Sequence, residues 1–252
     1  MSLASKTAIV TGASRGIGRA IALHLASLGA NIVVNYQSSS AAADEVVKSI
    51  EASGTGVNAL AVKADVSYVS QGKELVEKTV ERFGKVDILV LNAGLLVGDK
   101  SLEKTEEADY DRAFGTNVKG VMFLVKSALP HVPSGGRILF FSTSLTAAST
   151  ITPNYFLYAA TKGAVEQMSR VLAKEVAHRG ITVNTISPGP IGTESFYDGK
   201  SEAVVDMIAK WNPVGRIGRP EEVARVVGWI SGEESSWVNG QNIRINGGMT
   251  VG

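Results

Sequence analysis

The chain of 252 residues contains no cysteine, which excludes disulfide bonds, thiolate nucleophiles, thiolate zinc ligands and lipid anchors attached to cysteine. Histidine is scarce as well. The three histidines, His24, His131 and His178, are far apart in the sequence, and none belongs to the H-x-x-x-H pair that is typical of a zinc-binding helix. We therefore predict no metal site.

An excess of charge of either sign is also missing, because 25 Lys and Arg residues face 24 Asp and Glu residues. Without a basic or acidic block, the sequence offers no electrostatic reason to expect nucleic acid or a membrane surface as partner. No apolar run is long enough to span a bilayer, and the segment Met1–Lys6 lacks the apolar core of a secretory signal. These absences favour a cytoplasmic protein.

The chain does contain a regular alternation of two patterns. Short β-branched apolar runs are typical of buried parallel strands, and the segments between them have helical spacing. Alternation of this kind predicts a single α/β domain over residues 1–252, a doubly wound Rossmann-type parallel sheet of about seven strands with helices on both faces. The expected strands are residues 7–10, 31–34, 59–62, 86–91, 137–141, 182–186 and 243–245, and the expected helices are 16–28, 41–53, 70–83, 110–129, 158–178 and 220–230.

A glycine-rich turn, Thr11–Gly18, follows the first expected strand and precedes the first expected helix. Glycines let the backbone approach a pyrophosphate, and the helix N-terminus offers free N–H groups and a partial positive charge. The spacing G-x-x-x-G-x-G differs from the commoner G-x-G-x-x-G, so a tight turn without a ligand is an alternative. Residues 12–16 also fit the G-x-S-x-G elbow of serine hydrolases, but Gly18 has a role only in a dinucleotide turn.

The end of the second expected strand bears on which dinucleotide is bound. NAD sites place a carboxylate there to hold the ribose 2′-hydroxyl, and the segment from Asn35 to Ser38 has none. Arg15 in the turn can pair with a 2′-phosphate, and Asn35 and Ser38 can form hydrogen bonds with it. The sequence therefore favours NADP(H).

Tyr158 and Lys162 lie four residues apart in an expected helix, and so on one helix face. A free tyrosine, with a pKa near 10, is a poor acid–base catalyst at neutral pH. A nearby cation lowers that pKa, so the phenol can exchange a proton with a carbonyl oxygen as hydride reaches or leaves the carbon. Such a pair is common in helices, and its significance depends on the other motifs.

Taken together and in this order, the motifs resemble those of the short-chain dehydrogenase/reductase family over essentially the whole chain. Within that family the sequence is most similar to NADPH-dependent carbonyl and aldehyde reductases, and 3-oxoacyl-thioester reductases are similar over most of the same residues. The motifs are the turn Thr11–Gly18, Asp65-Val66, Asn92-Ala93-Gly94, Asn117, Ser142-Thr143-Ser144, Tyr158 with Lys162, and Pro188–Thr193.

The resemblance implies a set of cofactor contacts. Asp65 and Val66 would border the adenine, and Asn92, Ala93 and Gly94 would line the far side of the ribose. Ile191 would reach the nicotinamide carboxamide through its backbone, and Thr193 through its hydroxyl. The full set of expected cofactor residues is Gly12, Ser14, Arg15, Gly16, Ile17, Gly18, Asn35, Ser38, Asp65, Val66, Asn92, Ala93, Gly94, Tyr158, Lys162, Pro188, Gly189, Ile191 and Thr193.

The resemblance also implies catalytic roles. Tyr158 would donate the proton in reduction, and Lys162 would lower the tyrosine pKa and hold the nicotinamide ribose. Asn117 would hold a water that relays protons to the lysine, and a serine would bind the substrate carbonyl. The family places that serine where this chain has Leu145, so we expect Ser144 in the role, with Thr143 as the alternative.

Two further expectations concern the substrate and the assembly. The irregular segment 189–212 is expected to be a substrate loop, since long excursions in a compact domain often bind ligands. Small residues along the Tyr158 helix permit close helix packing, and the resemblance implies a homotetramer or dimer. A non-catalytic NADP-binding regulator on the same fold is an alternative. Side chains that would favour an aromatic or medium-chain carbonyl substrate are Leu95, Leu96, Tyr155, Phe156, Phe196, Tyr197 and Trp211.

Overall fold

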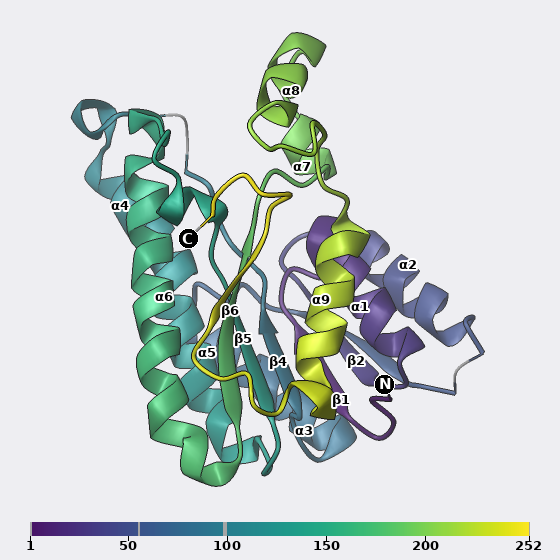
Figure 1. The fold of residues 1–252 in the computed structure, drawn as a ribbon. Coiled ribbons are helices and arrows are strands. Elements are labelled where there is room, and N and C mark those ends of the chain that lie inside the picture. The colour runs from purple at the N-terminus through teal and green to yellow at the C-terminus, as the bar shows by residue number, and fades with distance from the viewer. Residues whose placement is uncertain (1, 55, 98–99, 252) are drawn as a thin grey trace.

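The computed structural model describes residues 2–54, 56–97 and 100–251. Seven parallel strands form one sheet in the order β3-β2-β1-β4-β5-β6-β7 (Figure 1). The order reverses between β1 and β4, and in open α/β sheets ligands bind outside the carboxyl ends of the strands at such a point. The strands are β1 Thr7–Val10, β2 Asn31–Tyr36, β3 Ala59–Lys63, β4 Ile88–Leu91, β5 Arg137–Phe141, β6 Thr182–Pro188 and β7 Asn242–Ile245.

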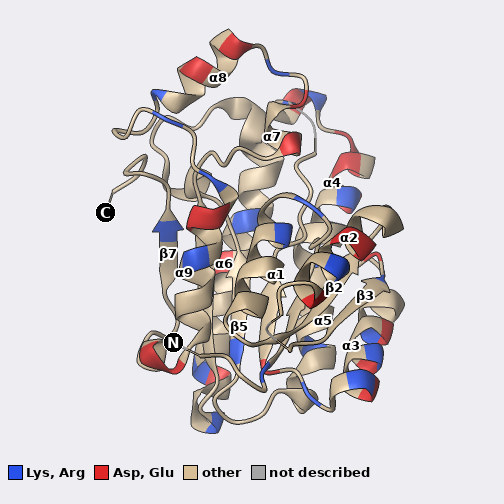
Figure 2. Ribbon diagram, turned by 90° about the vertical axis from the view of Figure 1, so that its right-hand side faces the viewer, with Lys and Arg blue, Asp and Glu red and all other residues tan. Residues whose placement is uncertain are grey.

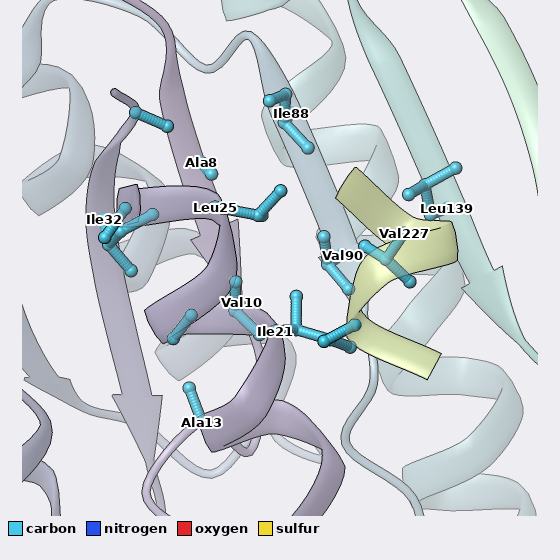
Figure 3. Packing of buried hydrophobic residues seen from close by; sticks show 14 of the residues in the cluster. Ala8, Val10, Ala13, Ile21, Leu25, Ile32, Ile88, Val90, Leu139 and Val227 are labelled. Atoms are coloured by element: carbon cyan, nitrogen blue, oxygen red, sulfur yellow. The ribbon is translucent and has the colours of Figure 1, made fainter. Parts of the chain in front are cut away.

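Helices cover both faces of this sheet because alternate strand residues point to opposite sides. Val10 and the other strand side chains on its face of the sheet pack against α1, α2 and α9. Ile9 and the strand side chains on the opposite face pack against α3, α5 and α6. Figure 3 shows the first layer, where Ile21 of α1 and Val227 of α9 lie near Val90 of β4. The predicted fold class is confirmed. The helices are α1 Gly16–Ser27, α2 Ser40–Glu51, α3 Val69–Phe83, α4 Glu107–Phe114, α5 Val121–Ala128, α6 Phe156–Val176, α7 Glu194–Tyr197, α8 Glu202–Ala209 and α9 Pro220–Ser231.

One expected helix differs in the structure. The predicted helix over 110–129 is divided by a π-helical turn, Gly115–Gly120, between α4 and α5. At its end the backbone runs so close to the segment after β3 that a Cβ atom on Gly120 would collide with the carbonyl oxygen of Val66. Widened turns of this kind are often found at functional sites, and this one carries Asn117.

The segment 189–212 leaves the sheet, and its two short helices, α7 and α8, lie beyond the carboxyl ends of the strands (Figure 1). Charged residues of both signs are interspersed along the outer helices (Figure 2), as on α3, where Lys78 pairs with Glu74 at 2.7 Å. None of the described helices combines the length and apolar character that crossing a membrane requires. The described residues contain no group of three or more His, Cys, Asp or Glu side chains placed to hold a metal ion.

The close approach at Gly120 leads to a stability prediction. We expect Gly120→Ala to lower the free energy of unfolding by about 1–3 kcal/mol, because the added methyl group must displace the Val66 backbone. Urea unfolding followed by circular dichroism measures the change.

Gly72→Ala in α3 is the matched control, since its Cβ atom would meet Leu124 at an ordinary 3.7 Å. Replacing a helical glycine by alanine should raise stability by about 0.5–1 kcal/mol. Equal effects of the two substitutions would contradict the packing argument.

Candidate active site

The glycine turn between β1 and α1 has the geometry of a phosphate cradle. Gly12 and Gly16 have φ angles of 63° and 55°, in the left-handed region that favours glycine. A Cβ atom on Gly18 would collide with the Gly12 carbonyl oxygen, so the start of α1 lies directly on the turn. Among the described residues no side chain caps α1, and its first turn contains no acidic residue. This helix N-terminus therefore fits the negative charge of a pyrophosphate.

Hydrogen bonds from neighbouring strands hold the turn in place. Asn92 Nδ2 donates to the Thr11 carbonyl oxygen at 2.8 Å, and the Ala93 N–H donates to Thr11 Oγ1 at 2.9 Å. Beneath the turn, Asn35 Oδ1 accepts from the Gly12 N–H at 3.2 Å. The end of β4 and the end of β2 thus orient the loop between them.

The position of Asn35 corrects one expectation from the sequence. Its side chain is only 2% exposed, and its Nδ2 donates to the carbonyl oxygens of Val62 and Ala64. A buried amide must satisfy its donors and acceptors internally, so Asn35 supports the turn and does not face a 2′-phosphate. Arg15 and Ser38, the other two residues expected at that phosphate, are exposed at the same edge.

Asp65 follows β3 and is partly exposed beside the turn. Its carboxylate accepts hydrogen bonds from the backbone and hydroxyl of Ser67 and from Gln37 Nε2. Burial raises the pKa of Asp65, but the bonds from Ser67 and Gln37 outweigh this and hold the pKa below its usual value. Gln37 was not among the predicted site residues, and it ties the end of β2 to the residue expected to border the adenine.

The segment after β6 lies against the glycine turn. The Gly189 N–H donates to the Ile245 carbonyl oxygen at 3.0 Å, which fixes the segment to β7 where Pro188 ends β6. Ile191 is buried, and the Cγ2 atom of Thr193 lies 3.2 Å from the Cβ position of Gly16. The structure thus brings the turn after β1 and the segment after β6 into contact. The Thr193 hydroxyl accepts from the Phe196 N–H and caps α7.

Tyr158 and Lys162 lie on one face of α6, as predicted. The Lys162 side chain is buried, its Nζ donates to the Phe141 carbonyl oxygen at 2.8 Å, and it lies 5.7 Å from the Tyr158 ring centroid. The same Nζ is 3.2 Å from the Cβ position of Gly94, so the expected ribose-binding segment borders the lysine.

The pKa values of this pair differ from the expected direction. Burial raises the pKa of Tyr158 to about 12, with a smaller contribution from Tyr155, and burial lowers the pKa of Lys162 to about 8. The predicted lowering of the Tyr158 pKa is therefore wrong for this arrangement. Burial disfavours the charged phenolate, and the Lys162 ammonium donates its hydrogen bond to the Phe141 carbonyl oxygen.

Asn117 is buried in the π-helical turn and joins two parts of the site. Its Oδ1 accepts from the Leu95 N–H at 2.7 Å, and its Nδ2 donates to the Leu95 carbonyl oxygen and to Thr161 Oγ1. Thr161 directly precedes Lys162, so the amide links the segment after β4 to α6. The water relay expected of Asn117 stays a prediction. Thr161 was not predicted, although its place beside the lysine is a signal in the sequence.

The three hydroxyls at the end of β5 point in different directions. Ser142 donates to Glu166 of α6, Thr143 accepts from the Leu145 N–H, and Ser144 donates to the Ser187 carbonyl oxygen at 3.1 Å. Ser144 begins a 3-10 turn, Ser144–Ala147, at the carboxyl end of the sheet. The choice of Ser144 over Thr143 as the substrate-binding hydroxyl stays a prediction.

The apolar residues expected around the substrate lie at the same end of the molecule, outside the core clusters that cover the sheet. Leu96, Phe156 and Trp211 are exposed, and Phe196 packs edge-on against Tyr197 with ring centroids 5.2 Å apart. The role of the segment 189–212 as a substrate loop stays a prediction.

The buried ammonium predicts a dependence of stability on pH. Unfolded Lys162 keeps its proton up to the ordinary pKa of 10.5, whereas the folded chain releases it near 8, so stability rises with pH between these values. We expect the unfolding free energy of the wild type, relative to Lys162→Met, to increase from pH 7.5 to pH 9.5. Chemical denaturation at both pH values measures this difference.

Lys126→Met, at an exposed position on α5, reports the effect of removing a lysine from the surface. If the difference in unfolding free energy between the wild type and Lys162→Met is the same at pH 7.5 and pH 9.5, burial is not the cause of the lowered Lys162 pKa.

Comparison with known proteins agrees with this geometry. A family model described as enoyl-(acyl carrier protein) reductase matches residues 12–250. A protein named NADPH-dependent aldehyde reductase-like protein, chloroplastic, from Arabidopsis thaliana is 44% identical over 98% of this chain and 94% of its own length. A short-chain type dehydrogenase/reductase from Picea abies is 43% identical over 98% of this chain and 93% of its own.

Among solved structures, a short-chain dehydrogenase from Burkholderia cenocepacia in complex with NADP superposes with a TM-score of 0.92 and 34% identity, and 99% of each chain is covered. Sequence similarity and fold thus agree over nearly the whole length. The chain belongs to the short-chain dehydrogenase/reductase family.

Proposed function

We propose that this protein is an NADP(H)-dependent reductase that converts a ketone or an aldehyde into an alcohol, with Tyr158 as the proton donor. The observation that carries the proposal is the placement of Tyr158 beside the buried Lys162 on α6. Lys162 is held at the Phe141 carbonyl oxygen, with Tyr158 four residues before it on the same helix face. Both lie at the carboxyl end of the sheet, where the family binds its cofactor and where the glycine turn opens.

The comparisons support NADP(H) as the cofactor, since the Arabidopsis relative is named as NADPH-dependent and the Burkholderia structure contains NADP. In this chain the turn from Gly12 to Gly18 and the N-terminus of α1 would hold the pyrophosphate. Arg15, exposed at the start of α1, would pair with the 2′-phosphate. Lys162 and the segment from Asn92 to Gly94 would hold the nicotinamide ribose.

The chemistry that the bound cofactor supplies is the transfer of a hydride to the carbonyl carbon. The residues of this chain handle the oxygen. A hydroxyl at the end of β5, Ser144 in our assignment, would exchange its hydrogen bond with the Ser187 carbonyl oxygen for one that orients the substrate carbonyl. Tyr158, whose pKa of about 12 keeps the phenol protonated at neutral pH, would donate its proton to the developing alkoxide.

Lys162 would restore that proton. Because burial lowers its pKa to about 8, the ammonium can exchange a proton with its surroundings near neutral pH. Asn117 lies next to this group through Thr161, and a water held there would connect the lysine to solvent. The reverse reaction, oxidation of an alcohol, would use the same residues in the opposite order.

We also propose that the protein forms a homotetramer or a dimer. Exposed apolar side chains on the outer surfaces of α5 and α6, Met122 and Val171 among them, support contacts between copies. Closed symmetric assemblies are the common form of soluble oligomers.

The central test is Tyr158→Phe, assayed with NADPH and with NADH against aldehydes, ketones and a 3-oxoacyl thioester. We expect the wild type to oxidise NADPH with simple carbonyl compounds, and Tyr158→Phe to lower kcat by about 10²–10⁴-fold, as for loss of a general acid. Absorbance of the reduced nicotinamide measures the rate. Tyr110→Phe, at an exposed position on α4, is the control for loss of a tyrosine hydroxyl.

Other outcomes of this assay favour other functions. Turnover with the thioester alone would assign the chain to 3-oxoacyl reduction. Tight NADPH binding without turnover of any substrate in the panel would favour a non-catalytic regulator.

Arg15 is predicted to select NADPH over NADH. We expect Arg15→Gln to raise the KM for NADPH by about 10–100-fold, because a hydrogen bond between charged groups is lost. The KM for NADH should stay nearly unchanged. Steady-state kinetics with both cofactors measures the ratio. Arg19→Gln, one helical turn further along α1, is the control, and an equal loss for both cofactors in Arg15→Gln would contradict the assignment.

A further inference from the structure

Glu166 extends the face of α6 that carries the candidate catalytic residues. It follows Lys162 by four residues, as Lys162 follows Tyr158, so the three side chains line one side of the helix. The proposed proton transfer uses Tyr158 and Lys162 and does not involve Glu166. The function proposed above therefore assigns it no role.

One oxygen of Glu166 binds two hydroxyls of the neighbouring segment. Oε1 accepts from Ser142 Oγ at 2.7 Å and from Thr146 Oγ1 at 2.6 Å. A hydroxyl has a single proton, and for both residues the contact with the carboxylate is shorter than the alternative contact with a backbone carbonyl oxygen, 3.4 Å for Ser142 and 2.8 Å for Thr146. Hydrogen bonds to an ionised acceptor are also the stronger kind.

The two hydroxyls flank Ser144 on either side. Ser142 follows the last residue of β5, and Thr146 belongs to the 3-10 turn Ser144–Ala147, so the carboxylate joins the strand end to the turn. Between these two attachments, Ser144 donates to the Ser187 carbonyl oxygen of β6. The segment that carries the candidate substrate hydroxyl is thus tied to the helix that carries Tyr158 and Lys162.

We propose that Glu166 is a positioning residue, which holds the segment Ser142–Thr146 against α6 and so sets the place of the Ser144 hydroxyl relative to Tyr158. The inference rests on the proposed function. Carbonyl reduction needs the hydroxyl and the phenol to converge on one oxygen atom, and a displacement of about 1 Å at such a site costs about 10²-fold in rate. The bond from Lys162 Nζ to the Phe141 carbonyl oxygen already joins α6 to the end of β5, and Glu166 extends this connection past Ser144 to Thr146 of the turn.

The acceptor geometry of Glu166, more than its charge, is what this role requires. Both hydrogen bonds use the same oxygen, and an amide carbonyl oxygen has two lone pairs as well. Glu166→Gln should therefore preserve the attachment, whereas Glu166→Ala removes it. The double variant Ser142→Ala/Thr146→Val removes the same two bonds from the other side and leaves the carboxylate in place.

The experiment measures kcat, KM and the Kd of NADPH for these variants, each in the wild-type background and with Ser144→Ala. We expect Glu166→Ala to lower kcat by about tenfold, less than a full 1 Å displacement, with the Kd of NADPH unchanged. Glu166→Gln should restore most of the lost kcat, and Ser142→Ala/Thr146→Val should reproduce the loss. With Ser144 already replaced, Glu166→Ala should have little further effect.

An equal loss in both backgrounds would overturn the proposal, because Glu166 would then act by a route other than Ser144. Failure of Glu166→Gln to restore kcat would overturn it too, since charge would then be the property that matters. Should Glu166→Ala fail to fold, the double variant at Ser142 and Thr146 tests the same attachment from the strand side.

Amide hydrogen exchange separates this proposal from the proposed function. Exchange at residues 143–148 should be faster in Glu166→Ala than in the wild type, and Glu166→Gln should resemble the wild type. If the wild type reduces no carbonyl compound, the proposed function fails, and faster exchange in Glu166→Ala still supports the attachment. Unchanged exchange in Glu166→Ala would overturn the attachment even in an active enzyme.

Discussion

The buried ammonium of Lys162 is the group around which the carboxyl edge of this sheet is arranged. The side chain is only 4% exposed, and its Nζ donates to the carbonyl oxygen of Phe141 at the end of β5. A cation removed from water must find polar partners, so it restricts what can surround it. Gly94 leaves space beside Nζ, and Asn117 connects the segment after β4 to α6 through Thr161.

The same burial acts in opposite directions on the two members of the pair. It disfavours the charged form of each group, so it raises the pKa of Tyr158 and lowers that of Lys162. The Tyr158 phenol keeps its proton at neutral pH, and the Lys162 ammonium can release one near neutral pH. In the proposed reaction the phenol would donate the first proton to the oxygen, and the lysine would then replace it. In the proposed reduction, Tyr158 therefore starts as the protonated phenol.

Closely packed backbone and exposed side chains lie near one another at this site. Around the glycine turn and the π-helical turn, the backbones approach so closely that Gly18 and Gly120 leave no room for a side chain. Asn35 accepts a hydrogen bond from the glycine turn, and Asn92 donates one to it. In the segment 189–212, α7 and α8 lie beyond the sheet (Figure 1), and the aromatic side chains of Tyr197 in α7 and of Trp211 after α8 are exposed. Functional residues on variable loops above a constant scaffold are the means by which one fold serves many functions.

Several features of this protein follow from local patterns in the sequence. Apolar runs and helical spacing determined the parallel sheet and its two helical layers, because the period of a hydrophobic pattern depends on the residues within one element. The glycine turn and the Tyr158–Lys162 pair were recognised for the same reason, since each lies within a single element or at its end.

The tertiary structure decided what depends on contacts between distant segments. Burial beneath the turn makes Asn35 a support for it, and burial reverses the predicted shift of the Tyr158 pKa. The close approach of Gly120 to Val66 and the attachment of Ser142 and Thr146 to Glu166 likewise join residues far apart in the chain. Solvent exclusion and hydrogen-bond partners are properties of the packed molecule, and no pattern within one element specifies them.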